Sequence, residues 1–333
     1  MASVFLTGGT GFIGGALLGR LRERGDEVVA LARSERSAEI LTARGVTVAR
    51  GNVLDEDSLA RGMDGCELVL HVAGINSHCP ADPDMQLRVN VSGAEGAVRA
   101  AARAGVGRVV YTSSAASIGE AHGTVGREDS PHRGSYLSNY DRSKHEGEQA
   151  AFAAGAATGV EVVALNPSSV QGPGRSSGNG GMVIAYVNGT LRVFTRTHVS
   201  VVDIDDCVEG HLRAVDHGRA GERYILNGAT LTSEEALEIL YEVTGVRERV
   251  RMVPAPIARG VSAAAETLYR ARGRACPGCR ARVRTILHGH RYDGSRATRE
   301  LGLEYTPVEH TFARTIEWAA GQGLVTRDLP VAA

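Results

Sequence analysis

The chain has very little lysine, no long apolar run and no excess of charge of one sign. Of its 37 basic side chains only Lys144 is a lysine, and the formal net charge of the 333 residues is −1. No apolar stretch approaches the roughly 18 residues that a membrane-spanning helix needs. These absences argue against a membrane-embedded protein and against a general electrostatic attraction to nucleic acid or to anionic lipid.

The N-terminus and the cysteines indicate a cytoplasmic protein. The first residues run directly into glycines, without the basic and apolar regions of a secretory signal peptide. Five cysteines are an odd, scattered set in a long chain, which argues against a disulfide framework. Cys276, Cys279, His288 and His290 could together hold zinc, but their spacing is not that of a zinc finger. We therefore expect no metal, and we interpret the two cysteines as residues of a solvated loop.

The first half of the chain alternates between apolar, strand-like runs and helical stretches. Near-continuous apolar strands separated by helices predict a parallel sheet that is covered on both faces, which is the α/β, doubly wound arrangement of the Rossmann fold. Strands are expected at 4–6, 27–31, 46–48, 68–70, 108–111 and 160–165, and helices at 12–24, 35–43, 85–104 and 137–157.

The pattern changes after Pro167. Residues 172–174 and 176–181 are rich in glycine, proline and serine and predict a loop. Two further strand–helix units are expected near 199–214 and 224–243, a helix of small residues within 253–284, and a helical tail over 297–323 that is broken near Pro307. We expect a dinucleotide-binding core over 1–170 and a smaller, discontinuous substrate cap over 171–330, with segments near 199–228 returning to the core.

A glycine-rich turn follows the first strand and opens the first helix. It fits a dinucleotide fingerprint at Gly9, Gly11 and Gly14, and equally a spacing of three at Gly8, Gly11 and Gly14. Glycine permits the tight turn and lets backbone N–H groups approach a pyrophosphate, while the helix N-terminus adds positive potential. The position between strand and helix supports cofactor binding. The expected contacts are Gly8, Thr10, Gly11, Phe12, Ile13 and Gly14.

The second strand ends without the acidic residue that would hold the ribose 2′-hydroxyl of NAD. Ala32 and Arg33 stand at that place, followed by Ser34. A guanidinium and a hydroxyl suit a 2′-phosphate, because arginine makes charge-assisted bonds to phosphate. We therefore expect NADP(H) in preference to NAD(H). The alternative is that Arg33 simply faces solvent in an arginine-rich chain.

Tyr140 and Lys144 are expected four residues apart on one face of a helix that Ser138 caps. A free phenol titrates near pH 10, and a neighbouring ammonium together with an oxidised nicotinamide would lower its pKa. Tyr140 could then give a proton to a carbonyl oxygen or take one from an alcohol. Ser113 and Ser114 end the preceding strand, where a hydroxyl can bond the reacting oxygen. Each of these features alone is common in proteins without such chemistry.

Taken together, these segments resemble the extended short-chain dehydrogenase/reductase family, also called the NAD-dependent epimerase/dehydratase family. The resemblance runs through residues 7–14, 51–55, 71–74, 90–93, 111–114, 140–144, 166–174 and 201–206. It implies a catalytic triad of Ser114, Tyr140 and Lys144. The family usually has Asp at position 52, where this chain has Asn. The further cofactor contacts that the resemblance implies are Asn52, Val53, Ala73, Gly74, Pro167, Ser168 and Ser169.

Within that family the details resemble the dihydroflavonol-reductase-like branch, through Arg33 and the segments 166–169 and 221–226. The resemblance implies reduction of a ketone or aldehyde of a small organic substrate, or the reverse oxidation, with His78, Cys79 and Ser114 lining the substrate pocket. It also implies a homodimer through the helices around 85–104 and 138–157. The alternatives are a nucleotide-sugar epimerase or dehydratase with bound NAD, and a non-catalytic NADP-sensing regulator.

Overall fold

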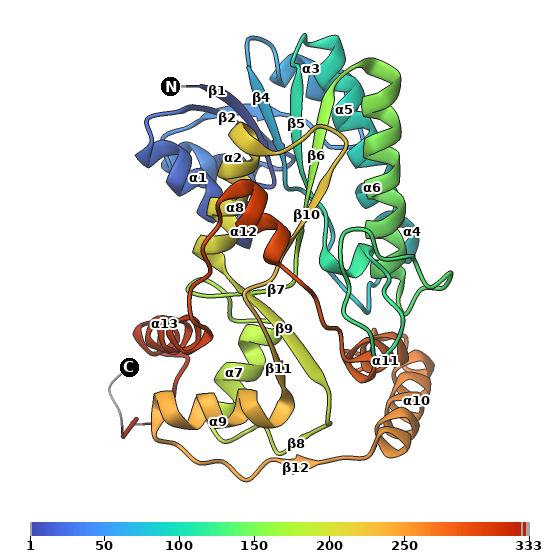
Figure 1. Ribbon diagram of the computed structural model, residues 1–333, viewed down its shortest axis with the longest axis vertical. Helices are drawn as coiled ribbons and strands as arrows, with labels where there is room; N and C mark the ends of the chain where they lie inside the picture. Colours follow the sequence, from blue (N-terminus) through green and yellow to red (C-terminus); the bar gives the residue numbers. More distant parts are fainter. Residues whose placement is uncertain (1, 328, 331–333) are drawn as a thin grey trace.

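The chain is built around a large parallel sheet, as the computed structural model of residues 2–327 and 329–330 shows (Figure 1). Residues 1 and 328, which the expected core and cap ranges include, lie outside the described part. The strands of this sheet are β1 (Ser3–Thr7), β2 (Glu27–Ala32), β3 (Thr47–Arg50), β4 (Leu68–His71), β5 (Arg108–Thr112), β6 (Glu161–Pro167) and β10 (Arg223–Leu226).

The order of the seven strands is β10-β6-β5-β4-β1-β2-β3, and every neighbouring pair is parallel. The predicted Rossmann-type, doubly wound α/β fold is therefore confirmed. The winding direction reverses at β1, which pairs with β2 on one side and with β4 on the other. In such sheets ligands bind beyond the carboxyl ends of the strands at this reversal. The turns that follow β1 and β4 are thus the first place to look for a site.

Helices cover both faces of the sheet because successive strand residues point to opposite sides. In β1, Leu6 packs into the cluster on one face and Phe5 into the cluster on the other, and both side chains are fully buried. The first face carries α1 (Phe12–Glu23), α2 (Glu35–Ala43), α8 (Ile204–His217) and α12 (Ser295–Leu301). The second carries α3 (Glu56–Gly62), α5 (Gly93–Arg103) and α6 (Asn139–Thr158).

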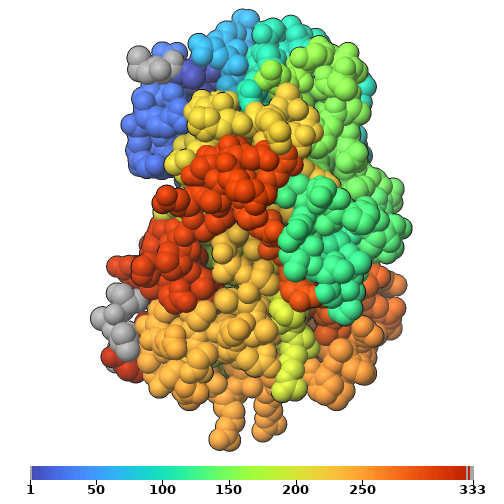
Figure 2. Space-filling view, viewed as in Figure 1, coloured from blue at the N-terminus to red at the C-terminus, as the bar shows by residue number. Residues whose placement is uncertain are grey.

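The second half of the chain adds a lower region with an apolar cluster of its own, which includes Tyr186, Leu240, Phe312 and Ile316 (Figure 1). Its strands are β7 (Ser169–Gln171), β8 (Val193–Phe194), β9 (His198–Asp203), β11 (Ala229–Thr232) and β12 (Arg251–Met252). Its helices are α7 (Asn179–Val187), α9 (Ser233–Thr244), α10 (Ala255–Ala271), α11 (Arg280–His288) and α13 (Val308–Gly321). On the face that Figure 2 shows, part of the C-terminal third of the chain lies between the region of the large sheet and the lower region.

Two expected elements differ from the structure. The single helix expected over 85–104 is divided into α4 (Pro83–Leu87), the π-helical segment η1 (Arg88–Ser92) and α5. The widened turn lets the Asn90 amide reach the backbone of Ile75, a demand that helical periodicity does not reveal. The loop expected over 176–181 gives way to α7 at Asn179, and a Cβ on Gly180 would collide with the carbonyl oxygen of Arg175. Glycine is there for close packing of a helix and not for a turn.

Among the described residues, we find no helix with both the length and the apolar character needed to cross a lipid bilayer.

Candidate active site

The turn between β1 and α1 lets a ligand approach the backbone closely. Gly8 has a φ of +75°, and a Cβ on it would lie 2.8 Å from the backbone nitrogen of Ala73. A Cβ on Gly14 would collide with the carbonyl oxygen of Gly8, whereas one on Gly9 would meet only side chains. The spacing of three at Gly8, Gly11 and Gly14 therefore describes the turn. Gly11 caps α1 without a side-chain bond, so the first helical N–H groups can bind a pyrophosphate, and the cradle fits a dinucleotide.

Hydrogen bonds to the Thr7 side chain connect this turn to the segment that follows β4. Its buried hydroxyl accepts hydrogen bonds from the N–H groups of Val72, at 3.1 Å, and Ala73, at 3.0 Å. Gly74 follows directly, and a Cβ there would lie 3.4 Å from the Nζ of Lys144. Ala73 and Gly74, two of the expected cofactor contacts, are thus placed between the glycine turn and the side chain of Lys144.

Arg33 follows β2 and is exposed, as is Ser34. Ser34 caps α2, with its hydroxyl accepting a bond from the N–H of Ser37 at 3.2 Å. The next acidic residue, Glu35, is paired with Arg50 at 2.7 Å. Over the range of the chain that the structure describes, Arg33 has no ion-pair partner. A free guanidinium therefore stands where an NAD-binding strand would end in a carboxylate.

Asn52 and Val53 form the turn after β3. The Asn52 Oδ1 accepts a bond from the N–H of Leu54 at 3.1 Å, and its backbone N–H donates to the hydroxyl of Ser58 at 3.2 Å. Val53 packs against α5, because a Cβ on Gly93 would lie 3.3 Å from its Cγ2 atom. These hydrogen bonds fix the backbone of the turn, while the Asn52 side chain remains exposed.

Tyr140 is the second residue of α6, and the predicted cap of that helix is confirmed. The Ser138 hydroxyl accepts a bond from the N–H of Asp141 at 3.1 Å and donates to its carboxylate at 2.7 Å. Tyr140 is 7% exposed and lines a cavity of about 560 Å³, together with Ser113 and Ser114 from the end of β5. The structure thus brings the tyrosine and both candidate serines to one wall.

The pKa of Tyr140 does not follow the expectation from sequence. Burial raises it, while a hydrogen bond with Ser114 and the charge of Arg175 act in the opposite direction. Lys144 was expected to lower this pKa, but its ammonium instead donates a bond to the carbonyl oxygen of Thr112 at 2.9 Å. In the protein alone, Tyr140 is therefore held in its protonated form at neutral pH.

Lys144 is 5% exposed and lies one turn after Tyr140 in α6. Burial lowers its pKa to about 8, and the negative charge of Glu148 opposes that shift. Burial and the charge of Lys144 in turn lower the pKa of His71, at the end of β4, to about 3, so this imidazole is neutral. The ammonium uses one donor on Thr112, which leaves donors for a ligand such as a ribose hydroxyl.

Ser114 is held in place by Asn166, a residue at the end of β6. The Asn166 amide donates to the backbone oxygen of Ser114 at 3.2 Å and to the hydroxyl of Ser117 at 2.8 Å. Ser114 itself begins the short 3₁₀ segment η2 (Ala115–Ser117), accepting a bond from the N–H of Ala116 at 3.2 Å. Asn166 is therefore a positioning residue for the serine.

Pro167, Ser168 and Ser169 also line the cavity. The N–H of Ser168 donates to the backbone oxygen of Leu226 at 2.9 Å, which fixes the segment against β10. Its hydroxyl oxygen is buried and has no partner among the described residues. An unsatisfied hydroxyl in this position suits a polar group of the cofactor, for which the resemblance implies a contact here.

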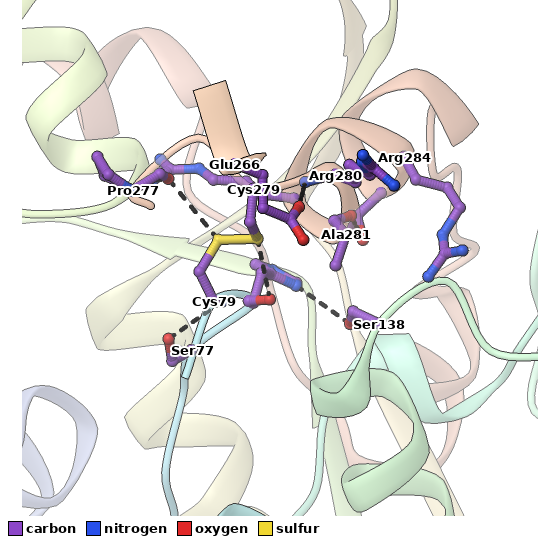
Figure 3. Close-up of a disulfide and its surroundings, with 12 residues drawn as sticks. Ser77, Cys79, Ser138, Glu266, Pro277, Cys279, Arg280, Ala281 and Arg284 are labelled. Atoms are coloured by element: carbon purple, nitrogen blue, oxygen red, sulfur yellow. Dashed lines mark hydrogen bonds between the residues drawn. A yellow bond between two sulfur atoms is a disulfide. The ribbon is translucent and has the colours of Figure 1, made fainter. Parts of the chain in front are cut away.

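The cysteines require a correction. Cys79, in the loop after β4, and Cys279, before α11, form a disulfide across a sequence separation of 200, with Cα atoms 6.0 Å apart (Figure 3). The argument against a disulfide framework did not foresee this bond, because only the fold brings these two loops together. Cys276 is a buried free thiol, so neither cysteine is a solvated loop residue. The cysteine–histidine zinc set considered from the sequence does not form, because Cys279 is bonded to Cys79.

The disulfide lies beside the tyrosine. His78 precedes Cys79, and its ring stands edge-on to the ring of Tyr140, with centroids 5.2 Å apart. The His78 Nδ1 atom is 3.3 Å from the hydroxyl of Ser138, and burial lowers the pKa of this imidazole. His78 and Cys79 both line the cavity. The disulfide thus ties a wall of the cavity to the C-terminal region.

The most important residue that the sequence did not single out is Arg175. Its guanidinium lies over the ring of Phe12, 5.5 Å from the centroid, and donates a 2.8 Å bond to the backbone oxygen of Val170. It lines the cavity, and burial lowers its pKa. A cation between the glycine turn and Tyr140 can bind an anionic group. The sequence predicted a loop on either side of Arg175, over 172–174 and 176–181, but did not single out the arginine among the small residues.

Comparison with known proteins matches residues 4–227 to the NAD dependent epimerase/dehydratase family. A Synechocystis sp. protein that carries the name of dihydroflavonol 4-reductase is 30% identical over 330 residues, which cover 96% of this chain and 95% of the relative. A Stigmatella aurantiaca protein named as a 4-hydroxy-2-methyl-3-oxo-4-farnesyl-3,4-dihydroquinoline-1-oxide ketoreductase is 30% identical over 310 residues, 90% of each chain. Among solved structures, gox2253 superposes with a TM-score of 0.85 at 26% identity, covering 98% of this chain and 100% of that one.

Proposed function

We propose that the chain uses NADPH to reduce a ketone or aldehyde. It belongs to the NAD dependent epimerase/dehydratase family, in its dihydroflavonol-reductase-like branch. It is therefore an NAD(P)-dependent oxidoreductase of the short-chain dehydrogenase/reductase type. The observation that carries the proposal is the common wall of Ser114 and Tyr140 in one cavity, with Lys144 a turn away and the glycine cradle beside it. The oxidation of an alcohol is the reverse of the same reaction.

The side chains divide the chemistry between them. The bound nicotinamide supplies the hydride. The Tyr140 hydroxyl, kept protonated by burial, donates its proton to the carbonyl oxygen as negative charge develops there. The Ser114 hydroxyl donates a second hydrogen bond to that oxygen. The charge of Arg175 stabilises the phenolate left on Tyr140. The ammonium of Lys144 binds a ribose hydroxyl through its free N–H groups.

The preference for NADPH rests on Arg33. Its exposed and unpaired guanidinium can make charge-assisted bonds to a 2′-phosphate, and the Ser34 hydroxyl lies at the N-terminus of α2, which also favours an anion. The buried Ala32 offers no carboxylate to a ribose 2′-hydroxyl. NAD(H) is therefore the weaker ligand in this proposal.

The cavity supports a mid-sized and mainly apolar substrate. Its volume of about 560 Å³ is within the range of sites that bury drug-sized molecules. The ketoreductase relative is named for a farnesylated quinoline oxide, and the Synechocystis relative for a dihydroflavonol. Apolar side chains also line the cavity, among them Val183, Leu191, Phe194, Leu240 and Phe312.

The test is to incubate the purified chain with NADPH and a panel of aldehydes and hydrophobic ketones, following the loss of reduced-nicotinamide absorbance. We expect turnover of at least one carbonyl and weaker support by NADH. NAD that stays bound through purification, together with epimerised nucleotide sugar and no NADPH oxidation, would identify an epimerase instead. NADPH binding without turnover of any carbonyl would favour a non-catalytic sensor.

A further inference from the structure

Three ligand-type side chains outside the proposed chemistry meet at one point beside the cavity. Glu120 belongs to the loop after η2, His288 is the last residue of α11, and His290 follows after Gly289. The Glu120 Oε1 atom is 3.3 Å from the Nε2 of His288 and 2.5 Å from the Nδ1 of His290. One ligand atom from each residue lies within 4.8 Å of the other two. The sequence pattern did not single out Glu120 or join it to the two histidines, and the proposed function assigns none of the three a role.

We propose that Glu120, His288 and His290 form a binding site for one divalent ion of the zinc type. Two imidazoles and a carboxylate are the nitrogen and oxygen donors that zinc takes in proteins. Bonds of about 2.0–2.1 Å in a tetrahedron separate the ligand atoms by about 3.3 Å. The distance between Glu120 and His288 already matches that separation, and His290 needs to withdraw by less than about 1 Å. The fourth position is left to a water or another oxygen.

The second observation is that Glu120 and His288 carry buried polar atoms without a hydrogen-bond partner among the described residues, whereas the Nδ1 of His290 also lies 3.0 Å from the hydroxyl of Tyr292. Glu120 and His288 have side chains that are only 1% and 7% exposed. The Oε2 of Glu120 and the Nε2 of His288 have no hydrogen-bond partner in the range that the structure describes. The Nε2 of His288 lies 3.3 Å from a carboxylate oxygen, so either a metal cation or a proton on that nitrogen must lie between the two atoms. Arg133 does not supply it, because its guanidinium bonds the backbone oxygen of Glu120 and the carboxylate of Asp141.

Hydrogen bonds already fix the backbone around Glu120, His288 and His290, so an ion that binds them would have to order less of the chain. The N–H of Gly126 donates to the oxygen of Arg291 at 2.8 Å, and the N–H of Asp293 returns a 3.0 Å bond to Gly126. The hydroxyl of Ser200 donates to the oxygen of His290 at 3.0 Å. The loop after β5 and the end of α11 also lie side by side in Figure 2. An ion would therefore clamp the core to the C-terminal region at a place where His290 lines the cavity.

The experiment uses full-length protein from which any histidine tag has been removed. After dialysis against chelator, zinc and cobalt are titrated, with binding followed by metal analysis of the washed protein and by the visible absorption of tetrahedral cobalt. We expect one equivalent per chain, and a higher thermal unfolding midpoint with zinc that added chelator reverses. Glu120→Gln and His288→Ala should each weaken binding at least about 100-fold. His310→Ala, on the exposed face of α13, should bind like the wild type.

The wild-type titration keeps the proposal testable even if a variant misfolds, and circular dichroism reports whether each variant is folded. Failure of the wild-type protein to take up zinc or cobalt would overturn the proposal and leave protons as the cations between Glu120 and the imidazoles. Equal uptake by wild type and a folded His288→Ala variant would also overturn it, as would loss of binding in His310→Ala. None of these measurements depends on catalytic activity, so the site and the proposed reductase function are tested separately.

Discussion

The ammonium of Lys144 donates a 2.9 Å hydrogen bond to the backbone oxygen of Thr112. This bond joins α6, which carries Tyr140, to the end of β5, which leads into Ser114. The three side chains are therefore set on two elements that the lysine itself holds together. The absence of any other lysine from the sequence accords with a position where a compact ammonium is required. An arginine has a planar, larger head that could not take the same place beside Gly74.

The lowered pKa of Lys144 predicts how reduction depends on pH. Because the folded-state pKa is about 8, the charged form is complete below that value and is lost as pH rises through it. Tyr140 has a raised pKa and stays protonated over the same range, so it does not limit the rate there. We expect kcat/KM for reduction to be flat near neutrality and to fall above pH 8, measured with NADPH and an active ketone.

The matched variant for this prediction is Lys144→Arg. It should lose most activity, because the guanidinium cannot replace the ammonium, but its residual rate should lack the alkaline fall. A fall in the wild type centred near 10.5, the ordinary value for lysine, would contradict the assignment. The same shift affects folding with a defined sign. Between pH 8 and 10.5 the unfolded state binds more protons, so this group makes the protein more stable as pH rises through that window.

Replacing Tyr140 by Phe removes the proton donor and little else. We expect kcat to fall by on the order of 10²–10⁴-fold, while NADPH affinity, measured by fluorescence titration, changes little. Tyr269→Phe, in α10 and away from the cavity, serves as the control and should retain full activity. Retention of wild-type kcat by Tyr140→Phe would show that another group supplies the proton.

Replacing Arg33 by Ala should weaken NADP(H) selectively. Loss of a charged hydrogen-bonding partner for the 2′-phosphate costs about 1.5–3 kcal/mol, which corresponds to roughly 10- to 150-fold in Kd. The affinity for NAD(H) should not change. Arg61→Ala, exposed on α3, is the control. An equal loss for both cofactors, or no loss for either, would mean that Arg33 merely faces solvent.

Breaking the Cys79–Cys279 bond should destabilise the protein and disturb the cavity wall. A crosslink across 200 residues restricts the unfolded chain strongly, and its removal typically costs about 2–5 kcal/mol. We expect Cys79→Ser to lower the free energy of unfolding in urea by that amount. Because His78 contacts Tyr140, the KM for the carbonyl should rise more than kcat falls.

A dithiol reductant provides the control for that variant. Added to the wild type, it should reproduce the loss of stability, and added to Cys79→Ser it should change nothing further. Identical unfolding of the wild type with and without reductant would show that the two sulfur atoms are not bonded in solution.

Much of the core could be predicted from sequence because its strands and helix starts depend on residues that are close together in the chain. Buried parallel strands are apolar on both faces, and the capping serines Ser34 and Ser138 mark where α2 and α6 begin. In the first turn, Gly14 is required by the carbonyl oxygen of Gly8 only six residues earlier, and Gly8 by its positive φ, although Gly8 also approaches the distant Ala73. Tyr140 could be predicted because it lies at a helix start, and the strand end indicated Ser113 and Ser114, of which the family resemblance selected Ser114.

The features that escaped prediction depend on contacts between distant segments. The disulfide joins residues 79 and 279, and Glu120 meets His288 only through the fold. The π-helical turn at Asn90 serves a bond to Ile75, in a loop 15 residues earlier. Arg175 reaches the cavity from a segment whose small residues predicted only a loop. Neither the periodicity nor the spacing of residues in a single sequence predicts such contacts between distant segments.

The most direct test of the central claim is isotopic. The chain is given NADPH carrying deuterium at the transferable position of the nicotinamide, together with a carbonyl that supports turnover, and the alcohol product is analysed by mass spectrometry. The account predicts one deuterium on the former carbonyl carbon in product made by the wild type, and formation slowed by on the order of 10²–10⁴-fold in Tyr140→Phe. Product without deuterium at that carbon, or deuterated product formed equally fast by Tyr140→Phe, would contradict it.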